Sequence, residues 1–507
     1  MIRRLTRRQA LTHAAVGSAL LASACGRPGT IVPDRSGSTL RTTYGDPLGT
    51  GQLSPRSGEP LRTRTELGPS AAPVATLGTL AHLTDAHVLD AASPARVTFL
   101  DRLGPPFQST FRPQETLTAQ VLTGAVRAVR ALGPDAVIQG GDLIDNDQAN
   151  EMTIALTVLA GGVTRPGSGP SGYFGVQSPV DADPFYYRPD LDDPRHPGLL
   201  HAASRAFAGP GLGVPWLPVL GDHDILVAGE IAPTAQTRAL ALGAQAIWDL
   251  PSGLTLPPGF GGARSLKAAD ISPDGPPSPG LVDGFLAQAL RSAKVDVPAD
   301  PTRRQLAANE AVGLLEAAAG RNGRLGRLDY AADIGVHLRV IVLDLARRAG
   351  GSGGLVTPGQ AEWLAGELAG AGERWVLIVS HQPLTGAQGA GPILALLDRQ
   401  PRVIAALSGH IHRSQITARP TTAGGYWLIS TASLIDYPQQ ARALRVLATA
   451  GGGVAIQTWM LDHVFPGRLG TISRQLAYLD AQGGRPEGFI GGRLDRNVIL
   501  HRGRVAA

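Results

Sequence analysis

The sequence predicts an α/β protein in which two mixed β-sheets pack together and helices cover their outer faces. Apolar runs of strand length alternate with helical patterns over most of the chain, which favours βα units. Further strand-like runs crowd the region after residue 425 and add antiparallel strands to this pattern. The 507 residues, 43% of them hydrophobic, are enough for a large core.

Each element is predicted from its own pattern of apolar and turn residues. A helix over 115–132 has its apolar residues on one face and is stopped by Gly133-Pro134. A second helix begins with the capping-box sequence Thr357-Pro358-Gly359-Gln360 and runs to about Leu368. The expected strands are a run ending at Leu83, then 136–138, 216–220, 338–343, 375–379, 403–407, 426–430, 444–449 and 454–460, the last three of them antiparallel.

Five short motifs follow these apolar runs, and they carry the residue types of a metal site. With Asp224 left aside, they contain three carboxylates and five histidines. Each is expected just past the C-terminal end of a strand, where open α/β sheets bind their ligands. A single Gly-His-x-His match arises easily by chance, so the ordered set carries the argument. The motifs are Asp85-Ala86-His87, Gly141-Asp142, Gly221-Asp222-His223-Asp224, His381 and Gly409-His410-Ile411-His412.

The order of the motifs and their flanking residues resemble the calcineurin-like metallophosphoesterases, from about Thr76 to Leu461. The resemblance implies a four-layer αββα sandwich of two mixed sheets with long lid insertions. It also implies two metal positions bridged by Asp142. The resemblance assigns Asp85, His87 and His412 to the first metal, and Asp222, His381 and His410 to the second.

The same resemblance implies a catalytic role for two further residues. His223 is expected to be the general acid that protonates the leaving oxygen. Asp224 is expected to orient its imidazole. Asp145 and Asn146, which follow the bridging carboxylate, are expected to support the site or its turn.

The cofactors implied are two divalent metal ions, with Mn, Fe, Zn and Co as the candidates. The chain has a single cysteine, Cys25, so the ligands are nitrogen and oxygen donors and no intramolecular disulfide forms. A bridging carboxylate holds two cations about 3.5–4 Å apart, and their charge yields hydroxide at neutral pH that attacks phosphorus in line. The function implied is therefore phosphoester hydrolysis, by a monoesterase or a diesterase.

Two alternatives to this function stay open: a nuclease or nucleotide phosphodiesterase, and a catalytically silent cell-surface binding protein. A silent protein would have an incomplete set of ligands or lack the acid, and neither is observed. Asp145 stands where purple acid phosphatases have a tyrosine ligand, so the chain looks more like the phosphodiesterase-type branch.

One residue departs from the family pattern. Asp222 stands where the family has asparagine, so three carboxylates face two divalent ions. Asp222 either adds a charged ligand to the second metal or turns away into a hydrogen bond without ligating.

The charge of the chain does not indicate a nucleic-acid partner. The formal net charge is +5, but all except Lys267 and Lys294 of the 46 basic residues are scattered arginines. With 65 glycines and 40 prolines, this composition is typical of biased codon usage. The expected partner is the phosphoester substrate, and the sequence gives no oligomeric state.

The first 25 residues resemble an export signal of the twin-arginine type, centred on Arg7-Arg8. The apolar stretch Ala14–Leu21 is too short to span a bilayer. Ala22-Ser23-Ala24-Cys25 is either a cleavage site or a lipobox whose cysteine is lipidated. Together with Ser93-Pro94-Ala95-Arg96, the signal resembles large exported actinobacterial members of the family. We expect a location outside the cytoplasm, as a membrane-anchored lipoprotein or a secreted protein.

The expected organisation has four parts, interrupted by two insertions at about 147–212 and 226–334. Long insertions between site-bearing strands are typical of lids. The first insertion carries aromatic residues between Tyr173 and Tyr187, which form either a small core or a substrate-stacking wall. The parts are the export signal (1–25), a Gly/Pro/Ser-rich tether with one short strand (26–70), the metallophosphoesterase domain (71–470) and a C-terminal extension (471–507).

Overall fold

A computed structural model describes residues 37–103, 109–180, 183–250, 284, 287–324, 326–485 and 488–504. It contains two mixed sheets, as the sequence predicts. The seven-stranded sheet has the order β3 (Arg62–Leu67), β19 (Val498–Arg502), β18 (Val454–Asp462), β17 (Gln440–Thr449), β4 (Pro73–Leu83), β5 (Ala136–Gln139) and β8 (Trp216–Pro218). The six-stranded sheet has the order β11 (Tyr330–Ile334), β12 (Leu338–Leu343), β13 (Trp375–Ser380), β14 (Val403–Ser408), β16 (Tyr426–Ser430) and β15 (Gln415–Arg419).

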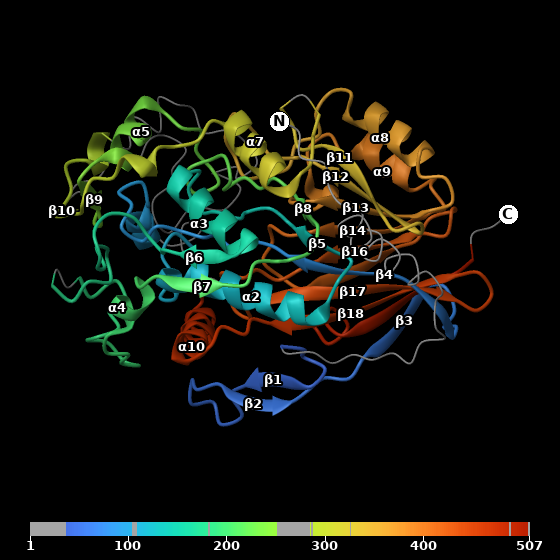
Figure 1. The fold of residues 1–507 in the computed structure, drawn as a ribbon, viewed down its shortest axis with the longest axis horizontal. Helices are drawn as coiled ribbons and strands as arrows, with labels where there is room; N and C mark the ends of the chain where they lie inside the picture. The colour runs from blue at the N-terminus through green and yellow to red at the C-terminus, as the bar shows by residue number, and fades with distance from the viewer. Residues whose placement is uncertain are drawn as a thin grey trace, which may run out of the picture.

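The central strands of the six-stranded sheet are buried on both faces, because β13 and β14 are apolar at every position except a final serine. On β12, Val340 and Val342 join the large core that also contains β4 and β17. Ile341 and Leu343 point to the other face, into a second core with Leu364 and Ile393. Those residues belong to α8 (Gln360–Ala369) and α9 (Gly391–Leu397), which cover the outer face of the sheet (Figure 1).

Helix α2 (Thr118–Leu132) covers the outer face of the seven-stranded sheet and contacts β17 and β18 (Figure 1). Its apolar face lies in the large core, and it ends at Gly133, whose φ of 64° is left-handed. Helices α3 (Ala149–Ala160) and α10 (Arg468–Gln482) pack against α2. The order of layers is therefore helix, sheet, sheet, helix.

Most predicted elements lie within a few residues of their expected bounds, with two differences. The predicted helix over 115–132 begins as a 3-10 turn, Glu115–Leu117, before α2. The expectation that β16 is antiparallel is wrong for its pairing with β14, which is parallel, whereas β17 and β18 are antiparallel as expected. At the predicted capping box only the Thr357 N–H to Gln360 side-chain bond forms, at 3.1 Å.

The expected tether is wrong for the part that the structure describes. Residues 42–57 form a hairpin of β1 (Thr42–Gly45) and β2 (Ser54–Ser57) (Figure 1). Strand β3 pairs in parallel with β19. Residues after 470 are likewise not an extension, because they supply α10 and β19. Arg62 and Arg64 make β3 look like a linker in sequence, but charged residues are typical of an edge strand. The export signal and Cys25 lie outside the described residues.

Part of the first insertion belongs to the large hydrophobic core. Met152, Ala155 and Val158 of α3 lie in the large core, and the chain then forms β6 (Gly162–Thr164), α4 (Leu199–Ala203) and β7 (Phe207–Gly209). In the aromatic cluster, Tyr186 is buried 4.9 Å from the ring of Phe111, so it forms a small core of its own.

In the residues that the structure describes, the second insertion contains helices and a short two-stranded sheet. Its elements are α5 (Ala235–Leu242), β9 (Gln245–Ile247), β10 (Lys294–Asp296), the 3-10 turn Pro301–Arg303 and α7 (Ala308–Ala319). Two further 3-10 turns, Thr98–Leu103 and Leu384–Gly386, lie elsewhere in the chain. The Gly/Pro-rich segment 251–282 is outside the described residues. Within the described part, no helix has the length and apolar character needed to cross a bilayer.

Both insertions are tied to the loop after the first motif. Asp90 of this loop accepts hydrogen bonds from Ser168 of the first insertion and from Nε of Arg303 of the second, the latter at 3.0 Å. The side chains of Asp90 and Arg303 are completely buried.

Candidate metal centre

The motif residues come together where the C-terminal ends of strands from both sheets meet. Asp85 and His87 follow β4, Asp142 follows β5, and the segment starting at Gly221 follows β8. From the six-stranded sheet, β13 ends just before His381 and β14 just before His410. Because parallel neighbours end at one edge, the fold places residues from five segments around one point.

One group of four donors consists of Asp85, His87, Asp142 and His412, whose ligand atoms all lie within 4.8 Å of one another. Nε2 of His412 is 3.3 Å from Oδ1 of Asp85, and 3.2 Å from Nε2 of His87. Nε2 of His87 is 3.7 Å from Oδ2 of Asp142.

A second group consists of Asp142, Asp222, His381 and His410, again with all ligand atoms within 4.8 Å. Nε2 of His381 is 3.0 Å from Oδ2 of Asp142 and 3.2 Å from Oδ1 of Asp222. Nδ1 of His410 is 3.3 Å from the same Asp222 oxygen. Asp142 belongs to both groups, and each group offers two carboxylates and two imidazoles.

The backbone at these residues is held in an uncommon conformation. The φ angles of Asp85, His87, Asp142, His410 and His412 lie between 43° and 65°, in the left-handed region that costs a non-glycine residue free energy. Hydrogen bonds between the loops compensate, from Asp85 N–H to the Gly141 carbonyl and from His87 N–H to the Asp142 carbonyl, both at 3.0 Å. A Cβ at Gly141 would lie 2.5 Å from Nδ1 of His381, so this position requires glycine.

Three of the histidines are oriented through their second ring nitrogen. Nδ1 of His87 lies 3.0 Å from the Asp145 carboxylate, and Nδ1 of His412 lies 2.5 Å from the Asp436 carboxylate. Nδ1 of His381 lies 2.8 Å from the Gly140 carbonyl. Each Nδ1–H is thereby donated outward and each Nε2 is turned to the centre, as in protein metal sites.

The side chains present fit a pair of cations. The Nε2 atoms of His87 and His412 face each other at 3.2 Å, so a proton or a cation must lie between them, because two lone pairs repel. Oδ2 of Asp85 is buried without a hydrogen-bond partner, and buried Nε2 of His381 lies close to two carboxylates without a hydrogen bond of good geometry to either. Burial disfavours a charged imidazole, yet the Asp85 and Asp436 carboxylates together outweigh it and raise the pKa of His412 to about 10. The same negative potential favours metal ions, so the buried groups are consistent with a dinuclear metal site.

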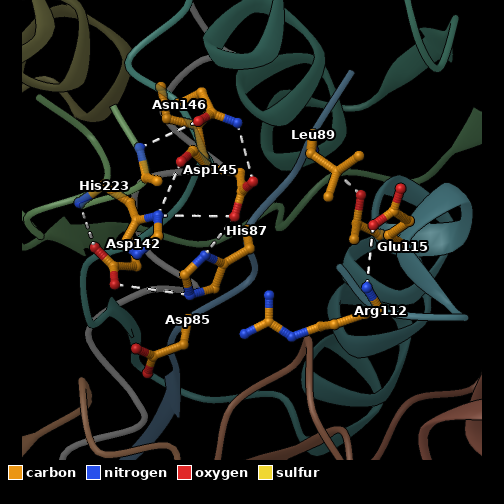
Figure 2. A network of polar contacts seen from close by, with 12 residues as sticks. Asp85, His87, Leu89, Arg112, Glu115, Asp142, Asp145, Asn146 and His223 are labelled. Carbon is orange, nitrogen blue, oxygen red and sulfur yellow. Dashed lines mark hydrogen bonds and ion pairs between the residues drawn. The ribbon is translucent and has the colours of Figure 1, made fainter. Parts of the chain in front are cut away.

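His223 lies beside the two groups and is partly exposed, with 20% of its side chain accessible. Its Nδ1 is 2.8 Å from the carbonyl oxygen of Asp145, and its ring is edge-on to that of His87 at 4.4 Å. Figure 2 shows Asp145 between these two imidazoles. Burial lowers the pKa of His223, but Asp142 and Asp222 outweigh this and raise it, which favours a protonated ring.

The expectation that Asp224 orients His223 is wrong. The Asp224 carboxylate instead accepts the backbone N–H groups of Leu143, Ile144 and Gly221, at 2.9, 3.2 and 2.8 Å. These bonds fix the turn that carries Asp142. Because the Asp224 carboxylate contacts these backbone N–H groups, it does not orient the imidazole of His223. Asp145 takes that role, in agreement with the supporting position that the sequence predicts for it.

Sequence reasoning missed the residues that hold the ligands from behind. Asp436, which anchors His412, also receives a 2.6 Å ion pair from buried Arg112. It follows β16 at the same edge as the motifs, so its position past a strand end was a usable signal. Gln382, next to His381, donates to Asp222 at 2.9 Å. For Arg112 we find no sequence signal.

Sequence comparison identifies no relative: no family model and no curated protein matches the chain. Solved structures that are similar to it include a dimetal phosphatase from Danio rerio, 14% identical with a TM-score of 0.37, covering 76% of this chain and 99% of that one. SoxB, a sulfate thiohydrolase from Thermus thermophilus, is 14% identical with a TM-score of 0.28, covering 80% of this chain and 60% of SoxB. PhoD is 11% identical with a TM-score of 0.28, covering 85% of this chain and 80% of PhoD.

These similarities are low, so the function is inferred from the geometry of the site itself. The structure is an α/β fold of two mixed sheets, and its buried Asp and His groups are suited to two metal ions.

Proposed function

We propose that this protein is a metal-dependent phosphoester hydrolase of the calcineurin-like metallophosphoesterase superfamily. One observation carries the proposal: two four-donor groups share Asp142, and the ligand atoms within each lie within 4.8 Å of one another. A shared carboxylate between two sets of imidazole and carboxylate donors is the arrangement of a two-metal hydrolytic site.

In this proposal Asp85, His87 and His412 hold one ion, Asp222, His381 and His410 hold the other, and Asp142 holds both. Mn, Fe, Zn and Co suit these nitrogen and oxygen donors. Two such ions, when bound, would supply an activated water and offset negative charge on a phosphoryl group.

His223 is the group of this chain that moves a proton. Its Nδ1–H is held by the Asp145 carbonyl, so the opposite nitrogen, Nε2, is left to face the substrate. Asp142 and Asp222 favour the charged ring, and a charged ring donates its Nε2 proton to the leaving oxygen. Access is from the face where His223, His410 and His412 are partly exposed, because the other donors are buried.

The complete donor set argues against a catalytically silent binding protein. We further propose, from the sequence of residues 1–25, that the protein acts outside the cytoplasm.

The test is hydrolysis of bis(p-nitrophenyl) phosphate and p-nitrophenyl phosphate by the purified chain after reconstitution with Mn, Fe, Zn or Co. We expect release of p-nitrophenol that is abolished by chelation and restored by metal. Binding of metal without turnover of either ester, under every metal, would favour the silent protein.

A further inference from the structure

Arg413, the residue directly after the last motif, contacts the aromatic ring of Phe489 at the rim of the site. The guanidinium carbon of Arg413 lies 5.3 Å from the centre of the Phe489 ring. That ring is edge-on to the imidazole of His412, with centroids 6.5 Å apart and planes at 87°. Arg413 is exposed, whereas His412 is 12% accessible.

The position of this pair relative to His223 follows from a row of ring contacts. The imidazole of His223 contacts that of His87 at 4.4 Å, and His87 contacts His412 at 5.1 Å. Phe489 is the next ring after His412, so three contacts separate it from His223. Arg413 and Phe489 therefore lie at the end of the row remote from the proposed general acid.

The pair is held in place before any ligand arrives. Ser414 N–H donates to the Phe489 carbonyl at 3.1 Å, and Phe489 N–H donates to the Tyr437 carbonyl at 3.3 Å. Within the described residues, no carboxylate pairs with Arg413, in contrast to nearby Arg112, which is paired with Asp436. The cation–π contact with Phe489 restricts the guanidinium, and its N–H groups have no carboxylate partner among the described residues.

We propose that Arg413, supported by Phe489, determines specificity by binding an anionic group on the part of the substrate that stays attached to phosphorus. The inference rests on the proposed function, which places the leaving group at His223. A monoester has no such second substituent. The preferred substrates are therefore phosphodiesters that carry a further anionic group, such as a second phosphate, on the substituent remote from the leaving oxygen.

The test uses two phosphodiesters with the same leaving group: thymidine 5′-(p-nitrophenyl phosphate), and the same compound with a 3′-phosphate. In both, water adds to phosphorus, the bond to p-nitrophenolate breaks and the nucleoside keeps the phosphate. We expect wild type to favour the 3′-phosphate by about 10- to 100-fold in kcat/KM, the size of a charge-assisted contact. Arg413→Gln should bring this ratio to about 1, and Arg413→Lys should keep part of it.

The matched control is Arg399→Gln, which removes the same charge from an exposed site before β14, at the opposite end of the strand from His410. It should leave the ratio unchanged, and unfolding midpoints should show that all three variants fold. A ratio near 1 in wild type, or an unchanged ratio in Arg413→Gln, would overturn the inference while hydrolysis itself persists. Absence of hydrolysis of both diesters would also overturn the inference, and the proposed function would fail with it only if p-nitrophenyl phosphate is not hydrolysed either.

Discussion

The carbonyl oxygen of Asp145 lies 2.8 Å from Nδ1 of His223, while the carboxylate of Asp145 lies 3.0 Å from Nδ1 of His87. One residue thus fixes both the proposed general acid and a proposed metal ligand. A change at His223 and a change at the metal ligands can be told apart, because only the second alters metal binding.

His223→Ala should keep its metal and lose about 10²- to 10⁴-fold in rate, the usual size of a general-acid contribution. The loss should shrink as the leaving group becomes more acidic, because a good leaving group needs no proton. Rates for a series of substituted phenyl esters, with metal content by mass spectrometry, check both points. Equal losses across the series would remove the general-acid role, and loss of metal would make His223 a ligand.

Asp224→Ala should act on stability, because it leaves three buried backbone N–H groups without their acceptor. We expect a loss of about 1–3 kcal/mol or more in the free energy of unfolding, measured with denaturant. The dependence of rate on leaving-group acidity should stay as in wild type. A changed dependence with unchanged stability would restore Asp224 as a partner of His223.

Asp222→Asn tests whether Asp222 is a charged ligand. Two divalent ions and the three carboxylates of Asp85, Asp142 and Asp222 give the site a net charge of +1. Asparagine at position 222 would raise this net charge to +2. The variant should therefore retain metal less well, while the higher charge lowers the pKa of bound water and moves the pH–rate profile to lower pH. The matched variant is Gln382→Ala, which removes the hydrogen bonds to Asp222 and to the Ser352 carbonyl but leaves the charge of Asp222 in place. Unchanged metal retention and an unchanged profile in Asp222→Asn would contradict a charged ligand.

Arg303→Met should destabilise the protein by about 3–5 kcal/mol, because it leaves the completely buried Asp90 carboxylate without its cation. Arg304→Met is the control, since the Arg304–Glu310 pair is exposed and such pairs contribute about 0–1 kcal/mol. Urea unfolding of both variants measures the difference. Similar losses in the two would show that Asp90 does not depend on Arg303.

Cys25→Ala should move the protein from the membrane to the soluble fraction of its host if the cysteine is lipidated. Fractionation and mass spectrometry of the mature N-terminus measure this. Wild-type protein that is already soluble and begins at residue 25 would favour simple signal cleavage.

The fold and the convergence of the site were predictable because the residues that matter follow strongly apolar strands. All seven residues named as metal ligands lie in the two donor groups. Their spacing along the chain fixes only their order, but the rule that ligands lie past strand ends places them together.

The wrong or missing predictions concern polar residues whose role depends on contacts with distant parts of the chain. Strand β3 is rich in arginine and threonine, and its place in the sheet depends on β19, more than 400 residues away. Asp224 is adjacent to His223 in sequence, yet its carboxylate is drawn to unpaired N–H groups of the Asp142 turn. Asp436 was missed because no motif surrounds it.

The central claim is tested most directly by measuring metal content and phosphodiester hydrolysis on the same samples of wild type and Asp142→Ala. Asp296→Ala, which changes an exposed aspartate of β10, is the control. We predict two ions per chain and turnover in wild type and control, and loss of both in Asp142→Ala at an unchanged fold. Near-normal turnover by Asp142→Ala, or turnover by metal-free wild type, would contradict a dinuclear centre.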